Sequence, residues 1–290
     1  MANQRPIETK IEDLTPKKPL LLCVDSDGCV MDSMAPKHKL CFGPLMIKEW
    51  NLFEYESEIL HLWINVNLYS KTRGVNRFRG LALVLKEVNA KYRPIVGIGN
   101  LLHWSESDEL SEISLMRKID ANQEVAIFKK ALAWSRAVNR ATSELGDNVL
   151  RPFAGVSDAL EYAHGFADIA VVSGASPDAL REEWERHGLV AHADLLLAQN
   201  AGSKAKCIDE LLKKGYAKEN ILMCGDSMGD LDAAEQNGIY FYPVLAGHEQ
   251  GSWQNFTTAF DAFKNQKYAE LQPELKEKFI NNLNGGTKNG

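Results

Sequence analysis

Three short apolar runs in the sequence each stop abruptly at a polar residue. Periodicity alone allows a buried helix or a buried strand for runs of this length. Their Leu-rich or β-branched content and turn-rich exits favour strands of a parallel sheet, which is covered on both faces. The runs are residues 19–24 before Asp25, 169–172 before Ser173, and 221–225 before Asp226.

Helical patterns alternate with these strands. Two of them follow a serine, which is a good N-cap, and end at a glycine. The alternation predicts an α/β fold with a doubly wound parallel sheet. The expected helices are residues 177–187, 204–214 and a segment near 230–236, and the further strands are 195–199 and 239–244.

Residues 36–148 have a different pattern, with amphipathic helical stretches and little strand alternation. We therefore expect an all-helical insert in a core made of residues 1–35 and 149–290. The charge supports two modules, because residues 33–150 carry a net charge of +3 and the remainder −9. The helical stretches of the insert are residues 78–88, 109–119 and 123–145.

Composition and charge exclude several classes of protein. The net charge of −6 argues against a general nucleic-acid or anionic-membrane binder, which needs a positive surface. No apolar run is long enough to span a bilayer, and the first 19 residues lack the apolar centre of a signal peptide. The five cysteines are scattered and never form a CxxC pair. These features predict a cytoplasmic protein with reduced thiols and no membrane or nucleic-acid partner.

Acidic residues gather at the ends of two predicted strands. Asp25 and Asp27 follow the first, and Asp226 and Asp230 follow another. In an open α/β sheet the carboxyl ends of the strands converge on one crevice, where four carboxylates would repel one another without a cation. Oxygen ligands with no His or Cys among them indicate Mg²⁺. An ordinary strand-exit turn is the alternative for Asp25 and Asp27 taken alone.

Groups suited to a phosphoryl ligand occur at the other strand ends. Lys204 lies in the first turn of a predicted helix, where the helix dipole disfavours positive charge and an anion would relieve the conflict. Ser173 and Gly174 can offer a hydroxyl and backbone N–H groups to phosphoryl oxygens. A surface lysine and a Ser-Gly turn are the alternatives for these residues.

Taken together, these segments resemble the four motifs of the haloacid dehalogenase superfamily, in its phosphohydrolase branch. The stretch VDSDGCVMDS resembles the first motif, VVSG the second, Lys204 the third and GDSMGD the fourth, in the family's order. Cys29 departs from the threonine that is common there, so a hydroxyl contact is lost. The presence of Asp27 favours phosphate esters, since members that cleave carbon–halogen or carbon–phosphorus bonds lack it.

The resemblance implies a role for each of these residues. Asp25 is the expected nucleophile that forms an aspartyl-phosphate, and Asp27 is the expected general acid and base. Mg²⁺ would be held by Asp25, the Asp27 backbone carbonyl and Asp226. Asp230 would support the metal site or orient Lys204, while Ser173 and Lys204 neutralise the transferred group.

The insert lies where this family has its helical C1 cap, which implies a small phosphorylated metabolite as the substrate. Arg73 and Arg77, four residues apart in a positive stretch of the insert, are the expected substrate contacts if that stretch is helical, although such a run also fits a solvated helix face. Two other functions stay open: a phosphomutase acting on a phosphosugar, and a non-enzymatic phosphate-sensing module similar to a phospho-receiver.

Overall fold

The computed structural model of the chain describes residues 7, 9–107, 109–121, 125–146 and 149–285. Within this part of the chain no helix has the length and apolar character needed to cross a bilayer. Its residues divide into two compact units, one formed by residues up to 33 together with residues 150–284, and the other by residues 34–149. Each unit is described by itself below.

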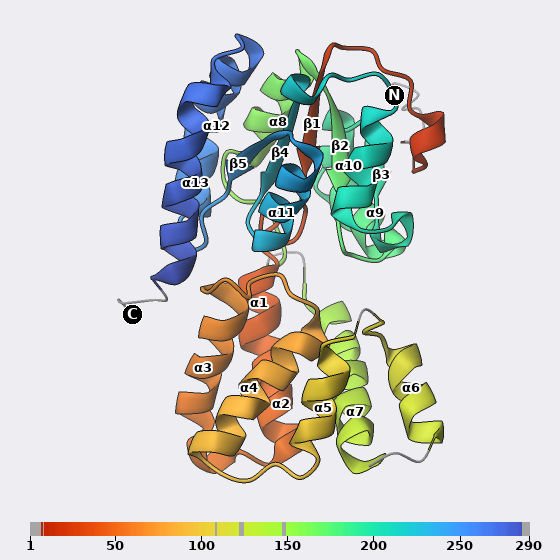
Figure 1. Cartoon of the computed structure of the whole chain (residues 1–290), viewed down its shortest axis with the longest axis vertical. Helices are drawn as coiled ribbons and strands as arrows, with labels where there is room; N and C mark the ends of the chain where they lie inside the picture. Colours follow the sequence, from red (N-terminus) through yellow and green to blue (C-terminus); the bar gives the residue numbers. More distant parts are fainter. Residues whose placement is uncertain (1–6, 8, 108, 122–124, 147–148, 286–290) are drawn as a thin grey trace. The chain divides into compact units, whose positions relative to one another are not determined.

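The first unit is built on a sheet of five parallel strands in the order β3-β2-β1-β4-β5 (Figure 1). All five fall on apolar runs for which the sequence predicts strands, and the predicted doubly wound α/β fold is confirmed. Every residue of the first four strands is buried, as expected for a sheet covered on both faces. The strands are β1 (Leu20–Val24), β2 (Ala167–Val172), β3 (Leu195–Leu197), β4 (Ile221–Gly225) and β5 (Tyr240–Pro243).

Helices cover both faces of this sheet. Leu20, Leu22 and Val24 of β1 share one apolar cluster with residues of α8, α9 and α12, whereas α10 and α11 pack together over the other face (Figure 1). The helices are α8 (Val156–His164), α9 (Pro177–Arg186), α10 (Lys204–Leu212), α11 (Met228–Asn237), α12 (Glu249–Lys264) and α13 (Tyr268–Asn284). Short 3₁₀ turns are η1 (Ile11–Asp13), η4 (Leu189–His192), η5 (Gln199–Ala201) and η6 (Lys218–Asn220).

Two of these helices, α12 and α13, lie outside the elements that the sequence predicts. They complete the core at the edge strand β5. Tyr268 Oη donates a hydrogen bond to the Phe241 carbonyl at 2.8 Å, and Gln272 Oε1 accepts one from the Phe241 N–H at 2.9 Å. Side chains of α13 thus satisfy backbone groups that would otherwise form an open sheet edge.

The strand register brings the polar strand ends to one level. Val24 pairs with Val171 on one side and with Cys224 on the other. The polar residues that follow β1, β2 and β4 therefore lie at the same level of the sheet, to within one residue. They are Asp25, Ser173 and Asp226. The sequence signals for the adjoining helices are also present, since the Ser203 side chain accepts from the Lys206 N–H and so caps α10 at Lys204.

The second unit consists of helices only, among the residues that are described. Its core is rich in aromatic side chains, such as the fully buried Trp63 and Trp134, whose rings pack edge to face. The prediction of an all-helical insert is confirmed. The helices are α1 (Met34–Lys37), the π-helical turn η2 (His38–Phe42), α2 (Gly43–Trp50), η3 (Phe53–Tyr55), α3 (Glu56–Leu68), α4 (Arg77–Lys91), α5 (Ile98–Ser105), α6 (Glu112–Asp120) and α7 (Val125–Ser143).

Candidate active site

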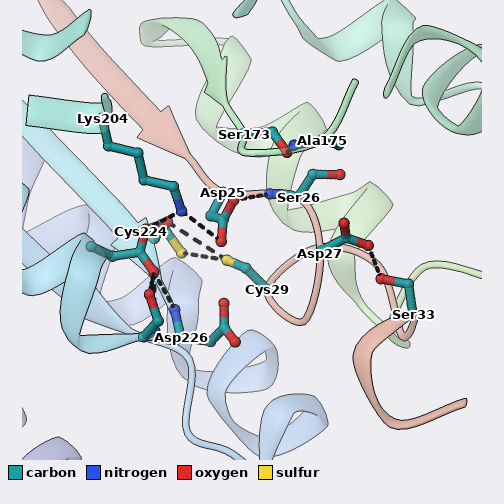
Figure 2. A network of polar contacts seen from close by, with 12 residues as sticks. Asp25, Ser26, Asp27, Cys29, Ser33, Ser173, Ala175, Lys204, Cys224 and Asp226 are labelled. Atoms are coloured by element: carbon teal, nitrogen blue, oxygen red, sulfur yellow. Dashed lines mark hydrogen bonds and ion pairs between the residues drawn. The ribbon is translucent and has the colours of Figure 1, made fainter. Parts of the chain in front are cut away.

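Asp25 occupies the centre of the site, directly after β1. Its side chain is buried, with a relative exposure of 6% for the residue. Oδ1 accepts a hydrogen bond from the Ser26 N–H at 2.8 Å, and Oδ2 lies 2.8 Å from Lys204 Nζ (Figure 2). The two oxygens of this carboxylate are thus held by different donors.

Lys204 links Asp25 to a second carboxylate. As the first residue of α10 it extends its ammonium group between Asp25 and Asp230, 2.5 Å from Asp230 Oδ1. Burial alone would lower the pKa of Lys204, but the adjacent Asp230 and Asp25 carboxylates raise it well above its usual value. Lys204 therefore stays protonated and supplies a fixed positive charge.

Asp230 is the most completely satisfied carboxylate of the site. Its Oδ2 accepts hydrogen bonds from the Ser227 hydroxyl at 2.7 Å and from the Ser227 N–H at 3.0 Å, at the start of α11. Its side chain packs directly over Gly225, where an added Cβ would come within 2.3 Å of the Asp230 Cβ. Gly225 is therefore required by this close approach, a constraint that the sequence motif shows only as a glycine before Asp226.

Three buried carboxylates form one acidic cluster. Asp25, Asp226 and Asp230 each offer an oxygen atom, and these oxygens lie within 4.8 Å of one another. Burial raises the pKa of Asp25 well above its usual value; Lys204 opposes this, and Asp230 and Asp226 add to it. With Lys204 protonated and the three carboxylates ionised, the cluster would carry two uncompensated negative charges. A divalent cation with a preference for oxygen ligands fits this set of donors.

Asp27 lies outside the acidic cluster. Its half-buried carboxylate accepts a hydrogen bond from the Ser33 hydroxyl, and Figure 2 shows it turned toward Ser33 and away from Lys204. Gly28 follows with φ of 80°, which allows the sharp turn that sets this direction. Among the groups of Asp27, the backbone carbonyl therefore stays a candidate metal ligand, and proton transfer by its side chain stays a prediction.

Ser173 and Gly174 follow β2, the strand that neighbours β1. The Ser173 N–H donates to the Leu197 carbonyl at 2.8 Å, and its Oγ accepts from the Ala175 N–H at 3.1 Å. A Cβ added at Gly174 would meet no atom of the described residues within 4 Å, its two chain neighbours apart. Neither packing nor a left-handed backbone explains Gly174, which is consistent with space for a ligand beside it.

A family model described as haloacid dehalogenase-like hydrolase matches residues 102–244. The match includes Ser173, Lys204, Asp226 and Asp230, and it begins after Asp25 and Asp27. Over these residues the chain resembles the haloacid dehalogenase-like hydrolases. No curated protein sequence matches this chain.

Several solved structures resemble the chain. A haloacid dehalogenase-like hydrolase from Xanthomonas campestris is 12% identical, with 91% of this chain and 98% of that chain covered and a TM-score of 0.49. A predicted phosphoglycolate phosphatase from Haemophilus somnus is 17% identical, with 78% and 86% covered and a TM-score of 0.47. A predicted β-phosphoglucomutase from Thermotoga maritima is 17% identical, with 77% and 84% covered and a TM-score of 0.44.

The two arginines expected to contact substrate do not share a helix face. Helix α4 begins at Arg77, because the side chain of Asn76 caps it by accepting from the Phe78 N–H, and Arg73 lies in the turn before it. The premise of one helical stretch is therefore wrong. Arg73 is buried and donates to the Leu68 carbonyl at 2.9 Å.

Arg77 is held inside the helical unit by other contacts. Its guanidinium donates to Asn139 Oδ1 at 2.6 Å and lies over the ring of Phe42, 5.2 Å from the centroid. Substrate contact by Arg73 or Arg77 stays a prediction. The contacts of both arginines show that each also has a structural role.

Cys29, where the family commonly has threonine, lies between Asp25 and Asp226 in Figure 2. Its Sγ is 3.9 Å from Cys224 Sγ, and both residues are fully buried (Figure 2). Burial raises the pKa of the Cys29 thiol well above its usual value. The thiol therefore stays protonated and packs as a small apolar group.

Replacing Lys204 with Met would remove the cation between Asp25 and Asp230 and keep an unbranched side chain. Two buried carboxylates then lose their shared partner, so we expect the free energy of unfolding in metal-free buffer at pH 7 to fall by about 3 kcal/mol. Chemical denaturation measures this change. A carboxyl whose pKa is higher in the folded than in the unfolded state favours the fold at low pH and loses that contribution as the pH rises. The deficit should therefore shrink on acidification.

The matched control is Lys213→Met, at the exposed end of the same helix. Lys213 pairs with Asp209 and Glu210 at the surface, where ion pairs contribute little. We expect almost no change in stability for this variant. A deficit in Lys204→Met that stayed constant between acidic and neutral pH would contradict the assigned charge pairing.

Proposed function

We propose that this protein is a Mg²⁺-dependent phosphatase that acts on a small phosphorylated metabolite through an aspartyl-phosphate intermediate. The observation that supports it most is the position of Lys204 Nζ, 2.8 Å from Asp25 and 2.5 Å from Asp230, beside a cluster of three buried carboxylates. Such a cluster with a fixed cation suits the binding of a metal and a phosphoryl group.

The metal would be held by the carboxylates of Asp25 and Asp226 and by the backbone carbonyl of Asp27. When bound, Mg²⁺ neutralises the two excess negative charges of the cluster and draws electron density from a phosphoryl oxygen. Asp230 is already occupied by Lys204 and Ser227, so it orients Lys204 in this scheme and supports the metal site indirectly.

Asp25 would act as the nucleophile. One of its carboxylate oxygens forms a bond to phosphorus while the ester P–O bond breaks, and the electron pair of that bond leaves with the alcohol oxygen. Lys204 keeps the carboxylate aligned and neutralises charge on the phosphoryl group, and Ser173 with the backbone after it meets the remaining oxygens.

Asp27 would act as general acid and then as general base. It gives its proton to the departing alcohol oxygen and afterwards takes a proton from the water that attacks the aspartyl-phosphate. The released products are the alcohol and inorganic phosphate, and Asp25 is regenerated. Asp27 lies outside the acidic cluster, and its carboxylate is directed at Ser33 and not at Lys204. This position supports separate roles for Asp25 as nucleophile and Asp27 as acid and base.

The helical unit is inserted between the first and second motifs, the position of the C1 cap in this family. We assign it the role of binding the organic part of a small substrate. This assignment rests on its place in the sequence.

A phosphate-release screen tests the proposed function. Sugar phosphates, nucleotides and phospho-acids are each incubated with the protein, with and without Mg²⁺, and inorganic phosphate is measured. We expect release from at least one ester, with a loss of at least about 100-fold when Mg²⁺ is removed by a chelator. Formation of an isomeric sugar phosphate without phosphate release would instead identify a phosphomutase, and a long-lived phosphoprotein without turnover would indicate a receiver-like module.

A further inference from the structure

Ser26, the residue between Asp25 and Asp27, has a side chain that faces away from the active site. Ser26 lies in the turn after β1, and Figure 2 shows its hydroxyl on the side away from Lys204. Ser26 is fully buried, so its hydroxyl needs a hydrogen-bond partner inside the protein.

Trp184 supplies that partner. This tryptophan lies on α9, 158 residues further along the chain, and is fully buried. Its indole Nε1–H, the one polar group of the side chain, donates to Ser26 Oγ at 3.0 Å. The indole N–H and the Ser26 hydroxyl thus satisfy each other, and without this hydrogen bond each group would be buried without this partner.

The backbone of Ser26 is fixed at the same time. Its carbonyl accepts hydrogen bonds from the N–H groups of Val30 at 3.0 Å and Met31 at 2.9 Å, which closes the loop after Asp27. Its own N–H donates to Asp25 Oδ1 at 2.8 Å and leaves Oδ2 directed at Lys204. The orientation of the Asp25 carboxylate therefore depends on how the Ser26 peptide is held.

We propose that Trp184 is a positioning residue for the nucleophile, acting through Ser26 on the orientation of the Asp25 carboxylate. The inference rests on the proposed function, in which Asp25 attacks phosphorus and binds the metal. A small rotation of the Ser26 peptide would misdirect a nucleophile that has to approach phosphorus along one line. Trp184 contacts neither the metal site nor the phosphoryl group in this arrangement.

The test compares two substitutions that each delete one buried hydrogen-bond donor from the same unit. Trp184→Phe removes the indole N–H, and Tyr268→Phe removes the hydroxyl that bonds the Phe241 carbonyl at the far edge strand. We expect both variants to lose some thermal stability. Only Trp184→Phe should lower kcat, by about 10- to 100-fold, with KM changed by less than about twofold.

A double-mutant cycle shows whether the effect passes through Ser26. Ser26→Ala deletes the acceptor of the same hydrogen bond with little change in volume, so it should reproduce the loss in kcat. The double variant should lose no more kcat than either single variant, because each substitution removes the same hydrogen bond. If Trp184→Phe does not fold, the comparison of kcat between Ser26→Ala and Tyr268→Phe is sufficient to test the proposal.

A second measurement separates this inference from the proposed function. Calorimetric titration with Mg²⁺ alone should give a dissociation constant about tenfold higher for Trp184→Phe and Ser26→Ala than for the unaltered protein and Tyr268→Phe. Absence of phosphate release from the unaltered protein would defeat the proposed function and leave this comparison intact. Equal kcat and equal Mg²⁺ affinity in Trp184→Phe and Tyr268→Phe would overturn the positioning role.

Discussion

Asp25→Asn reduces phosphate release by at least about 10⁴-fold at saturating substrate, if Asp25 is the nucleophile. An amide of the same shape cannot form the aspartyl-phosphate, and it also removes an anionic ligand from the cation site. Steady-state release of inorganic phosphate measures the loss. Acid quenching during turnover should trap phosphoprotein for the unaltered protein and none for this variant.

The stability of Asp25→Asn distinguishes lost chemistry from lost folding. Burial raises the pKa of Asp25, so its charge is unfavourable in the metal-free fold at neutral pH. We therefore expect the metal-free variant to be at least as stable as the unaltered protein at pH 7. Asp209→Asn, at an exposed position of α10, is the matched control and should keep activity within about twofold. Full activity in Asp25→Asn would refute the mechanism.

Asp27→Asn reduces kcat for alkyl phosphates by roughly 10² to 10⁴-fold, as expected when a general acid and base is lost. The reason lies in the leaving group, since an alkoxide departs poorly without a proton. With an aryl phosphate, whose leaving group needs no proton, formation of the aspartyl-phosphate should survive while its hydrolysis slows. Phosphoprotein should then accumulate, and intact-protein mass spectrometry detects it.

The comparison of the two ester classes provides the internal control for Asp27→Asn. A purely structural defect would lower the rate for alkyl and aryl phosphates by the same factor and leave no phosphoprotein. That outcome would remove Asp27 from proton transfer and would leave the role of Asp25 untouched.

Local signals account for the parts of the fold that sequence reasoning predicted. The strands β1, β2 and β4 are apolar runs that end at Asp25, Ser173 and Asp226, and the serine N-cap before Lys204 marks the start of α10. Burial and capping act over a few residues, so they can be recognised in one segment at a time. Helices α12 and α13 lack such clear signals beside strands and were not predicted.

The expectation that Arg73 and Arg77 share one helix face also fails for a local reason. A spacing of four residues places side chains on one face only inside a helix. The N-cap Asn76 lies between the two arginines and starts α4 at Arg77, so the rule did not apply.

Which residues can do chemistry, and at which strand ends they lie, followed from the order of amino acids, because short-range patterns of burial and capping set the secondary structure. Which oxygen meets which donor was decided by the tertiary structure. The placement of Lys204 between Asp25 and Asp230, of Ser33 against Asp27, and of Trp184 against Ser26 depends on strand register and helix packing. Hydrogen bonds form over about 3 Å, and only the folded chain positions distant segments that closely.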